Sequence, residues 1–188
     1  MIIGVTGPIC SGTDTFPRLL VEYYGFIFKS CSGMLESIAQ ERGKERNREY
    51  FQGLGDELRK GDSAAICRLL MKDYSSGTNY VVSNLRNPGE VEYLNGLGNF
   101  RLVLVYAPVK TRFDRLLGRG RDPDEPKTIE EFVEWEGRDL GFDQPDYGQR
   151  HAAVFAMAQG ILLNDSTPAV FSARIDGFMR SMHMGRVR

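Results

Sequence analysis

One short stretch near the start of the chain limits what the whole chain can fold into. Residues 7–15 read GPICSGTDT, with glycine at positions 7 and 12. An apolar run at residues 2–5 precedes the stretch, and an apolar-periodic segment at residues 16–24 follows it. This order predicts a strand, a glycine-bounded loop and a helix, and backbone N–H groups at such a helix N-terminus favour an anion.

The loop matches the phosphate-binding pattern G-x-x-x-x-G-K-[ST] in both glycines but not in the lysine. Thr13 stands at the lysine position. The backbone half of a phosphate cradle is therefore present, whereas the cation that contacts a transferred phosphate is missing. We predict that the phosphate-binding residues are Gly7, Cys10, Ser11, Gly12, Thr13, Asp14 and Thr15.

Short apolar runs alternate with helical patterns along the rest of the chain. The runs predict strands near residues 2–6, 26–30, 80–83, 101–106 and 161–163. Such alternation is typical of a parallel sheet with helices on both faces, here an α/β fold in a single domain over residues 1–188. Ligands of these sheets bind beyond the carboxyl ends of the strands.

Local signals mark several helix ends. Gly25 is expected to end the first helix in a left-handed conformation. Residues 87–90 and 128–131 read NPGE and TIEE, which predict capping boxes at two helix starts. Apolar residues at positions 50, 51, 54 and 58 predict one buried helical face.

Composition excludes several classes of protein. The net charge of −1 gives no overall attraction to nucleic acid or to an anionic membrane. The sequence shows no signal-peptide pattern and no apolar run of membrane-spanning length, so we expect a cytoplasmic protein. Three scattered cysteines predict reduced, half-buried thiols, and two histidines without partners at ligand spacing argue against a zinc site.

A charged segment at residues 118–128 contains two prolines and two glycines. It is either an ordinary exposed loop or a mobile lid that brings arginines over a phosphate, and the preceding phosphate loop favours the lid. Single arginines usually lie on solvated helix faces. As a set beside the ligand edge of the sheet, Arg115, Arg119 and Arg121 are our candidates for contact with the reacting phosphate.

Taken together, these residues resemble the P-loop nucleotide kinases. The resemblance is greatest to the dephospho-CoA kinase and deoxynucleoside monophosphate kinase group, and it extends to the kinase-like N-terminal domain of fungal dCMP deaminases. Residues 7–15 resemble G-x-x-x-S-G-K-D-T of that group, and residues 48–59, 85–91, 105–119 and 163–167 resemble later segments in the same order. The resemblance implies a P-loop NTPase fold with a five-stranded parallel sheet and a small lid.

The resemblance also implies ligands and roles. It implies ATP on the loop, Mg²⁺, and a small-molecule acceptor that carries a phosphate. By position, Arg48, Arg59 and Arg86 would bind the acceptor, Asn164 and Ser166 would contact the nucleotide base, and Asp14 would face the metal.

Four positions depart from the family pattern. Thr13 replaces the loop lysine, Ser83-Asn84 replaces an acidic residue that organises Mg²⁺, and Gly33 falls where an Asp would position the acceptor hydroxyl. Pro17 lacks an N–H in the first helix, which is either harmless in a first turn or opens the loop slightly. One engineered change at position 13 would not explain the other departures.

Three functions remain compatible with these residues. The favoured one is a module that binds a nucleotide or phosphorylated metabolite with weak or lost phosphotransfer. The second is an active nucleoside monophosphate or dephospho-CoA kinase with a displaced cation, either Lys29 or a lid arginine. The third is a structural or interaction protein. The zinc pattern of deaminases is absent, so the chain is not predicted to be a deaminase.

Overall fold

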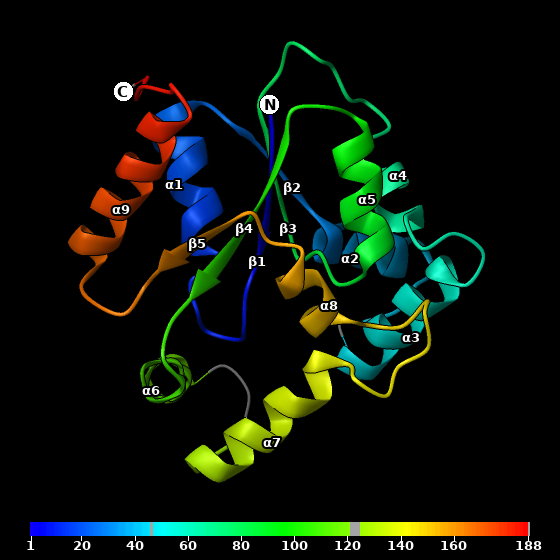
Figure 1. Cartoon of the computed structure of the whole chain (residues 1–188). Coiled ribbons are helices and arrows are strands. Elements are labelled where there is room, and N and C mark those ends of the chain that lie inside the picture. The colour runs from blue at the N-terminus through cyan, green and yellow to red at the C-terminus, as the bar shows by residue number, and fades with distance from the viewer. Residues whose placement is uncertain (46, 121–124, 188) are drawn as a thin grey trace.

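The computed structural model describes residues 1–45, 47–120 and 125–187, and for residues 48 and 138 it describes the backbone only. Five parallel strands form one sheet in the order β2-β3-β1-β4-β5 (Figure 1). Their bounds are β1 Ile2–Thr6, β2 Ile27–Ser30, β3 Tyr80–Ser83, β4 Phe100–Tyr106 and β5 Gly160–Leu163. All five predicted strands are present, with starts that differ by one residue at most.

Helices cover both faces of the sheet. They are α1 Thr15–Tyr24, α2 Cys31–Glu41, α3 Arg48–Arg59, α4 Ala65–Leu70, α5 Pro88–Gly96, α6 Val109–Arg119, α7 Ile129–Leu140, α8 His151–Ala156 and α9 Pro168–Ser181. Helices α1 and α9 lie on one face, whereas α2, α4 and α5 lie on the other (Figure 1). The predicted five-stranded α/β fold of P-loop kinases is confirmed.

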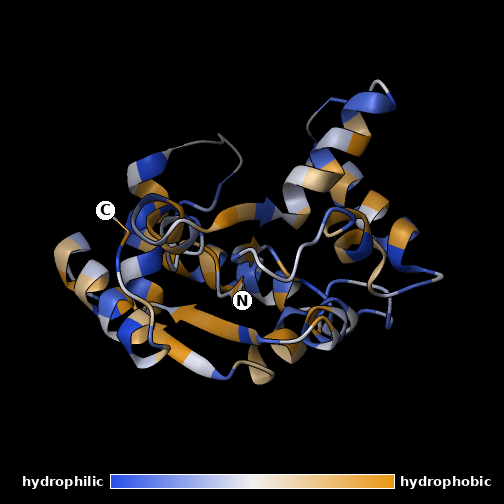
Figure 2. Ribbon diagram, turned by 90° about the horizontal axis from the view of Figure 1, so that it is seen from above, coloured by the Kyte–Doolittle hydropathy of each residue, from blue (hydrophilic) through white to orange (hydrophobic). Residues whose placement is uncertain are grey.

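Two apolar clusters hold these layers together. Ile3, Val5 and Val81 point from the sheet to Phe16 of α1 and Phe171 of α9. Residues of alternate parity on the same strands point to α2–α5 and α8 on the opposite face. The strands are therefore apolar on both faces, as buried parallel strands must be, and Figure 2 shows them mostly in the hydrophobic colour.

The helix ends predicted from the sequence are present in the structure. Gly25 ends α1 with φ of 69°, and Asn87 and Thr128 form complete capping boxes at α5 and α7. Helix α1 begins at Thr15, so Pro17 lies in the first turn, where N–H groups have no intrahelical partner. The harmless alternative for Pro17 is therefore correct. The predicted apolar face of α3 packs on the core, with Leu54 buried.

The cysteine prediction needs a correction. The three thiols are free, but Cys31 and Cys67 are fully buried and not half-buried. Although they are 36 residues apart, their Sγ atoms lie 3.7 Å from each other, because α2 and α4 turn them toward the same core. The hydrogen bond with Cys31 and the burial together raise the pKa of the Cys67 thiol well above its usual 9.0.

The two edge strands expose apolar side chains. Ile27 and Phe28 on β2 are 47% and 48% exposed, and Ile161 and Leu163 on β5 are 64% and 43% exposed. Within the described part of the chain, no helix has the length and hydropathy needed to cross a membrane.

Candidate functional site

The loop between β1 and α1 has no room for a side chain at Gly7 or Gly12. A Cβ at position 7 would lie 2.3 Å from the carbonyl oxygen of Val105. At position 12 the backbone φ is +114°, and a Cβ would lie 2.3 Å from Nδ2 of Asn164. Packing of β4 and of the β5–α9 loop against the phosphate loop thus fixes both glycines.

The loop keeps N–H groups available for an anion. Ser11 donates to the Pro8 carbonyl at 3.1 Å, and the N–H groups of residues 15 and 16 both donate to the Gly12 carbonyl at 3.0 Å. Among the described residues, none accepts a hydrogen bond from the N–H of Gly12, Thr13 or Asp14. These groups stand at the N-terminus of α1, where the helix dipole adds partial positive charge.

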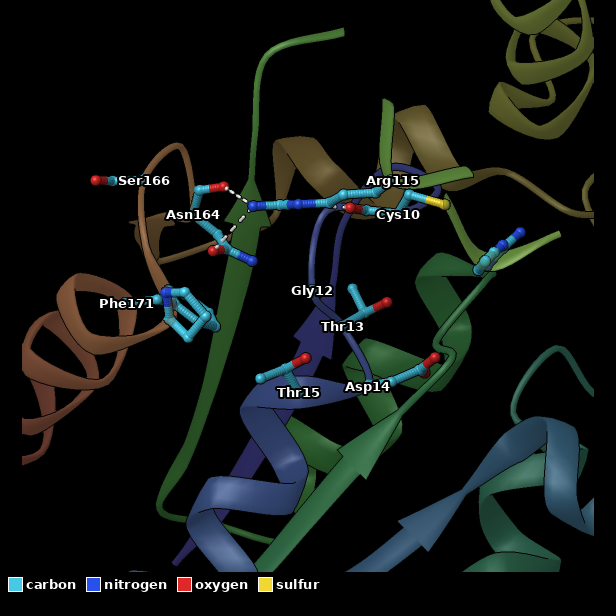
Figure 3. Close-up of a pocket in the computed structure, with 11 residues that line it drawn as sticks. Cys10, Gly12, Thr13, Asp14, Thr15, Arg115, Asn164, Ser166 and Phe171 are labelled. Carbon is cyan, nitrogen blue, oxygen red and sulfur yellow. Dashed lines mark hydrogen bonds between the residues drawn. The ribbon is translucent and has the colours of Figure 1, made fainter. Parts of the chain in front are cut away.

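A cavity of about 360 Å³ opens in front of the loop (Figure 3). Its lining residues are Cys10, Gly12, Thr13, Asp14, Thr15, Arg115, Arg119, Asn164, Ser166, Pro168 and Phe171. The volume lies in the usual range of small-molecule sites. The first nine of these residues belong to the predicted site, so the fold brings the phosphate loop, α6 and the β5–α9 loop together as expected; Gly7 and Ser11 lie in the loop behind the cavity.

Arg115 bridges two walls of the cavity. One terminal nitrogen donates to the Cys10 carbonyl at 3.2 Å. The other donates to the Asn164 carbonyl at 2.8 Å and faces the Oδ1 atom of that residue at 3.3 Å (Figure 3). Helix α6 therefore ties the phosphate loop to the loop after β5 through a single guanidinium group.

Asn164 takes part in the same link. Its Nδ2 donates to the Ser11 carbonyl at 2.8 Å, and its backbone N–H donates to the Tyr106 carbonyl at 2.7 Å. The side chain is 7% exposed. Asn164 lines the cavity while it holds the phosphate loop, and its contact with a base stays a prediction, as does that of Ser166.

The lid region is described only in part. Arg119 closes α6, lines the cavity and pairs with Glu125 at 2.9 Å. Gly120 follows in a left-handed conformation with φ of 47°. Arg121 and the rest of residues 121–124 lie outside the described residues, so the predicted lid and the predicted role of Arg121 are not observed here.

The thiol of Cys10 lies beside these arginines, in a residue with φ of 60°. Burial raises the pKa of this thiol above its usual 9.0 and outweighs the opposing effect of Arg119. The group is therefore neutral at physiological pH and adds no negative charge to the cavity.

Arg112, one turn before Arg115, has a structural environment. It is buried, donates to the carbonyls of Ala107 and Ile9, and forms a two-pronged ion pair with Glu136, whose second contact is 2.8 Å. This pair joins α6 to α7 behind the cavity, so Arg112 organises the wall without lining it.

The predicted acceptor residues lie elsewhere. Arg59 is 1% exposed and pairs at 2.8 Å with Glu90, which is 0% exposed. Arg86 donates to Gln149 at 2.7 Å, and the side chain of Arg48 lies outside the described residues. As placed here, the Arg59 guanidinium is enclosed in protein, and acceptor binding by all three arginines stays a prediction.

The carboxyl ends of β2 and β3 carry a neutral polar cluster. Nδ2 of Asn84, a residue with φ of 62°, lies within 3.2 Å of the hydroxyls of Ser30, Ser32 and Ser83. Gly33 donates its N–H to Ser30 as part of the α2 cap. The family pattern has carboxylates at the positions of Ser83-Asn84 and Gly33, which could hold a cation or take a proton from an acceptor. In this chain the groups at these positions are neutral and hydrogen-bond to one another.

The residues present do not form a protein-held Mg²⁺ site. Among the described residues, no group of three or more His, Cys, Asp or Glu side chains could hold a metal. At the end of β3 an amide nitrogen faces the hydroxyl cluster, and an N–H donor cannot be a ligand of a hard cation. Asp14, the predicted metal residue, is exposed and makes no cap bond.

Comparison with known proteins gives the family. A family model described as AAA domain matches residues 3–136. The chain belongs to the AAA domain family. A UPF0200 protein of Pyrobaculum aerophilum is 32% identical over 88% of each chain, and one of Sulfurisphaera tokodaii is 28% identical over 95% of this chain and 96% of its own.

Solved structures agree on the fold. TT1252 from Thermus thermophilus has a TM-score of 0.66 at 18% identity, with 98% of both chains covered. A dephospho-CoA kinase from Campylobacter jejuni has a TM-score of 0.59 at 14% identity, with 96% of both chains covered. At these identities the likeness is one of fold, which supports the kinase-like resemblance and leaves its subfamily open.

Two cavity residues were absent from the sequence prediction. Pro168 and Phe171 form the first turn of α9 and supply an apolar wall. The sequence does carry a signal for that helix start, since Thr167 precedes a proline at the first helical position and accepts from Val170. Nothing in that signal indicates that the turn faces a ligand cavity.

Proposed function

We propose that this chain binds a nucleotide, or another phosphorylated metabolite, in the cavity at the N-terminus of α1. The observation that carries the proposal is the convergence of phosphate-loop N–H groups, Arg115 and the loop after β5 on one cavity. Anion-favouring amides at a helix start, with a cation opposite, suit a phosphate group. The cytoplasm, where nucleotides and reduced thiols occur together, fits this function.

We further propose that phosphotransfer by this chain is weak or lost. Thr13 is short and uncharged, and removal of one preorganised charge contact costs about 3–4 kcal/mol, or roughly two to three decades in rate. The neutral cluster at Asn84 and the absence of a carboxylate at Gly33 remove two further catalytic groups. Residues that act as a unit fail together, so these losses reinforce one another.

An active ATP-dependent nucleoside monophosphate or dephospho-CoA kinase is the second candidate. It is favoured by the position of Arg115, a cation that lines the cavity. Lys29, the other candidate for a displaced cation, pairs with Asp73 at 2.7 Å, which leaves Arg115 as the better replacement.

Thermal unfolding tests the binding proposal. Millimolar AMP, ADP or ATP should raise the melting temperature, because a ligand at 100 times its Kd stabilises the folded state by about 2.7 kcal/mol. Adenosine, which lacks phosphate, serves as the control and should raise it less. A melting temperature unchanged by every nucleotide would exclude nucleotide binding and leave another phosphorylated metabolite or the structural alternative.

A turnover assay separates the two candidates. Coupled ADP release with deoxynucleoside monophosphates and dephospho-CoA should be near background for the natural chain. Thr13→Lys should tighten ATP binding yet restore little turnover, because it supplies neither missing carboxylate. Turnover by the natural chain on the order of 1 s⁻¹, as ordinary kinases show, would establish the active enzyme instead.

A further inference from the structure

The candidate cations differ in whether a carboxylate neutralises them. Lys29, Arg112 and Arg119 pair with Asp73, Glu136 and Glu125, respectively. Arg115 instead contacts only carbonyl and amide oxygens, of Cys10, Ser11 and Asn164. Within the described part of the chain, Arg115 is thus the lining cation whose full charge acts on a ligand.

The cavity also contains one negative charge. Asp14 is the lining carboxylate among the described residues, and it stands at the start of α1 beside the free N–H groups of the loop. Because its side chain is exposed and makes no cap bond, it is not neutralised by the helix. It opposes the accumulation of phosphate charge at this end of the cavity.

A bound magnesium ion would normally offset the charge of a triphosphate, but among the described residues Asp14 is the one carboxylate that lines the cavity. The end of β3 presents the Asn84 amide bonded to hydroxyls, and Thr13 replaces the lysine that neutralises the outer phosphates. A single exposed carboxylate, at Asp14, leaves the ion largely to water and to the ligand itself.

This charge balance points to a ligand with fewer phosphates. A terminal phosphate carries about two negative charges near neutral pH, and each additional phosphoryl group adds another. One guanidinium and one helix N-terminus together supply about 1.5 positive charges, which offset most of the charge of a monophosphate and about half that of a diphosphate. A triphosphate would leave the most charge uncompensated in a cavity that Thr13 and Asp14 also line. We propose that the cavity binds a nucleoside monophosphate or diphosphate without a divalent cation, in preference to the magnesium complex of a triphosphate. This inference rests on the proposed nucleotide binding.

Calorimetry of the full chain tests it directly. AMP, ADP and ATP are titrated in EDTA, and ADP and ATP again in excess Mg²⁺. Either AMP or ADP, measured in EDTA, should have an affinity at least about tenfold higher than that of ATP measured in Mg²⁺. The reason is that the site has no further protein cation to offset the charge of a third phosphate. Added Mg²⁺ should either leave the affinity for ADP unchanged or reduce it.

The two proposals fail in different ways. If ATP with Mg²⁺ binds tightest, the present inference is overturned and nucleotide binding stands. If none of the nucleotides binds, both are overturned.

A charge variant at Asp14 gives a second, independent readout. Asp14→Asn should tighten ADP in EDTA by about twofold to fivefold, the usual effect of one charge at a helix N-terminus. Glu22→Gln removes the same charge from an exposed position on the same helix and should leave the affinity unchanged. If Asp14→Asn instead weakens ATP only when Mg²⁺ is present, Asp14 holds the metal and the inference is wrong.

Discussion

The two sides of the sheet's ligand edge use their polar groups in opposite ways. On the phosphate-loop side, loop N–H groups and the charge of Arg115 face a cavity. On the side where the sequence predicted an acceptor, Arg59 is enclosed with Glu90, and Asn84 is bonded to serine hydroxyls. In a working kinase both sides present groups to substrates. Here one side faces a cavity, whereas on the other side the polar groups contact one another and only the Nη1 atom of Arg59 and the Oδ1 atom of Asp56 lack hydrogen bonds among the described residues near them. The role of a charged residue at a familiar position can therefore be assigned only once its partner is known.

The largest expected effect is on folding stability, from a substitution at Glu90. Its carboxylate accepts from Arg59 and from the backbone of residues 86 and 87. Glu90→Gln should reduce the free energy of unfolding by about 3 kcal/mol, the low end for a broken buried pair, because Asp56 also lies 3.6 Å from Arg59. Urea unfolding measures this, with Glu92→Gln on the exposed side of α5 as the control.

Nucleotide affinity of the folded Glu90→Gln protein is the sharper readout. If Arg59 is structural, the remaining folded protein should bind ADP as the natural chain does. In Glu90→Gln the Arg59 guanidinium loses its ion pair with Glu90. If the affinity for a phosphorylated acceptor then rises, Arg59 can bind the acceptor.

A change at Gly7 tests the phosphate-loop side. Gly7→Ala should destabilise the fold by about 3 kcal/mol, because the added Cβ would lie 2.3 Å from the Val105 carbonyl. It should also abolish nucleotide binding by displacing the loop. Gly53→Ala is the matched control: nothing lies within 4 Å of its Cβ in α3, so it should be neutral or stabilising. Equal effects of the two substitutions would contradict the packing argument.

Asn164→Ala should have a smaller effect, mainly on binding. It removes the bond to the Ser11 carbonyl that steadies the phosphate loop. We expect ADP affinity to fall about tenfold, as for loss of one buried hydrogen bond, with a change of melting temperature of only a few degrees. An unchanged affinity for inorganic phosphate but a weaker affinity for ADP would instead favour the base contact predicted from the sequence.

The smallest expected effect is a pH dependence from the buried thiol of Cys67. Cys67 has a pKa raised in the folded state, so the folded chain retains this proton at pH values where the unfolded chain loses it. The stabilisation from this group is therefore present below pH 9.0 and is lost as the pH rises above it. Cys67→Ala should flatten the alkaline fall in melting temperature, whereas Cys10→Ala should change it less, since Cys10 is half-exposed.

Much of the fold could be predicted because its signals are local. The strand runs, the left-handed Gly25 and the capping boxes at Asn87 and Thr128 each lie within a few residues of the structure that they specify. The approach of α6 and of the loop after β5 to the phosphate loop also follows, since parallel strands place their carboxyl ends at one edge.

The partners of the charges could not be predicted in this way. Arg59 meets Glu90 across 31 residues, and Arg112 meets Glu136 across 24. No periodicity links such positions, and the packing of α3 on α5 or of α6 on α7 decides them. The burial of Cys31 against Cys67 could not be predicted from the sequence for the same reason. The assignment of single arginines to an acceptor stays a prediction.

The exposed edges of the sheet bear on how the protein behaves at high concentration. An edge strand offers unpaired backbone groups to another chain, and charged side chains discourage such pairing. On β2, Lys29 supplies a charge next to the exposed Ile27 and Phe28, but β5 reads GILL and has none. The β5 edge, with Ile161 and Leu163 exposed, is therefore the expected starting point of aggregation. Ile161→Lys should extend the concentration range over which the protein remains monodisperse, without changing a residue that lines the cavity.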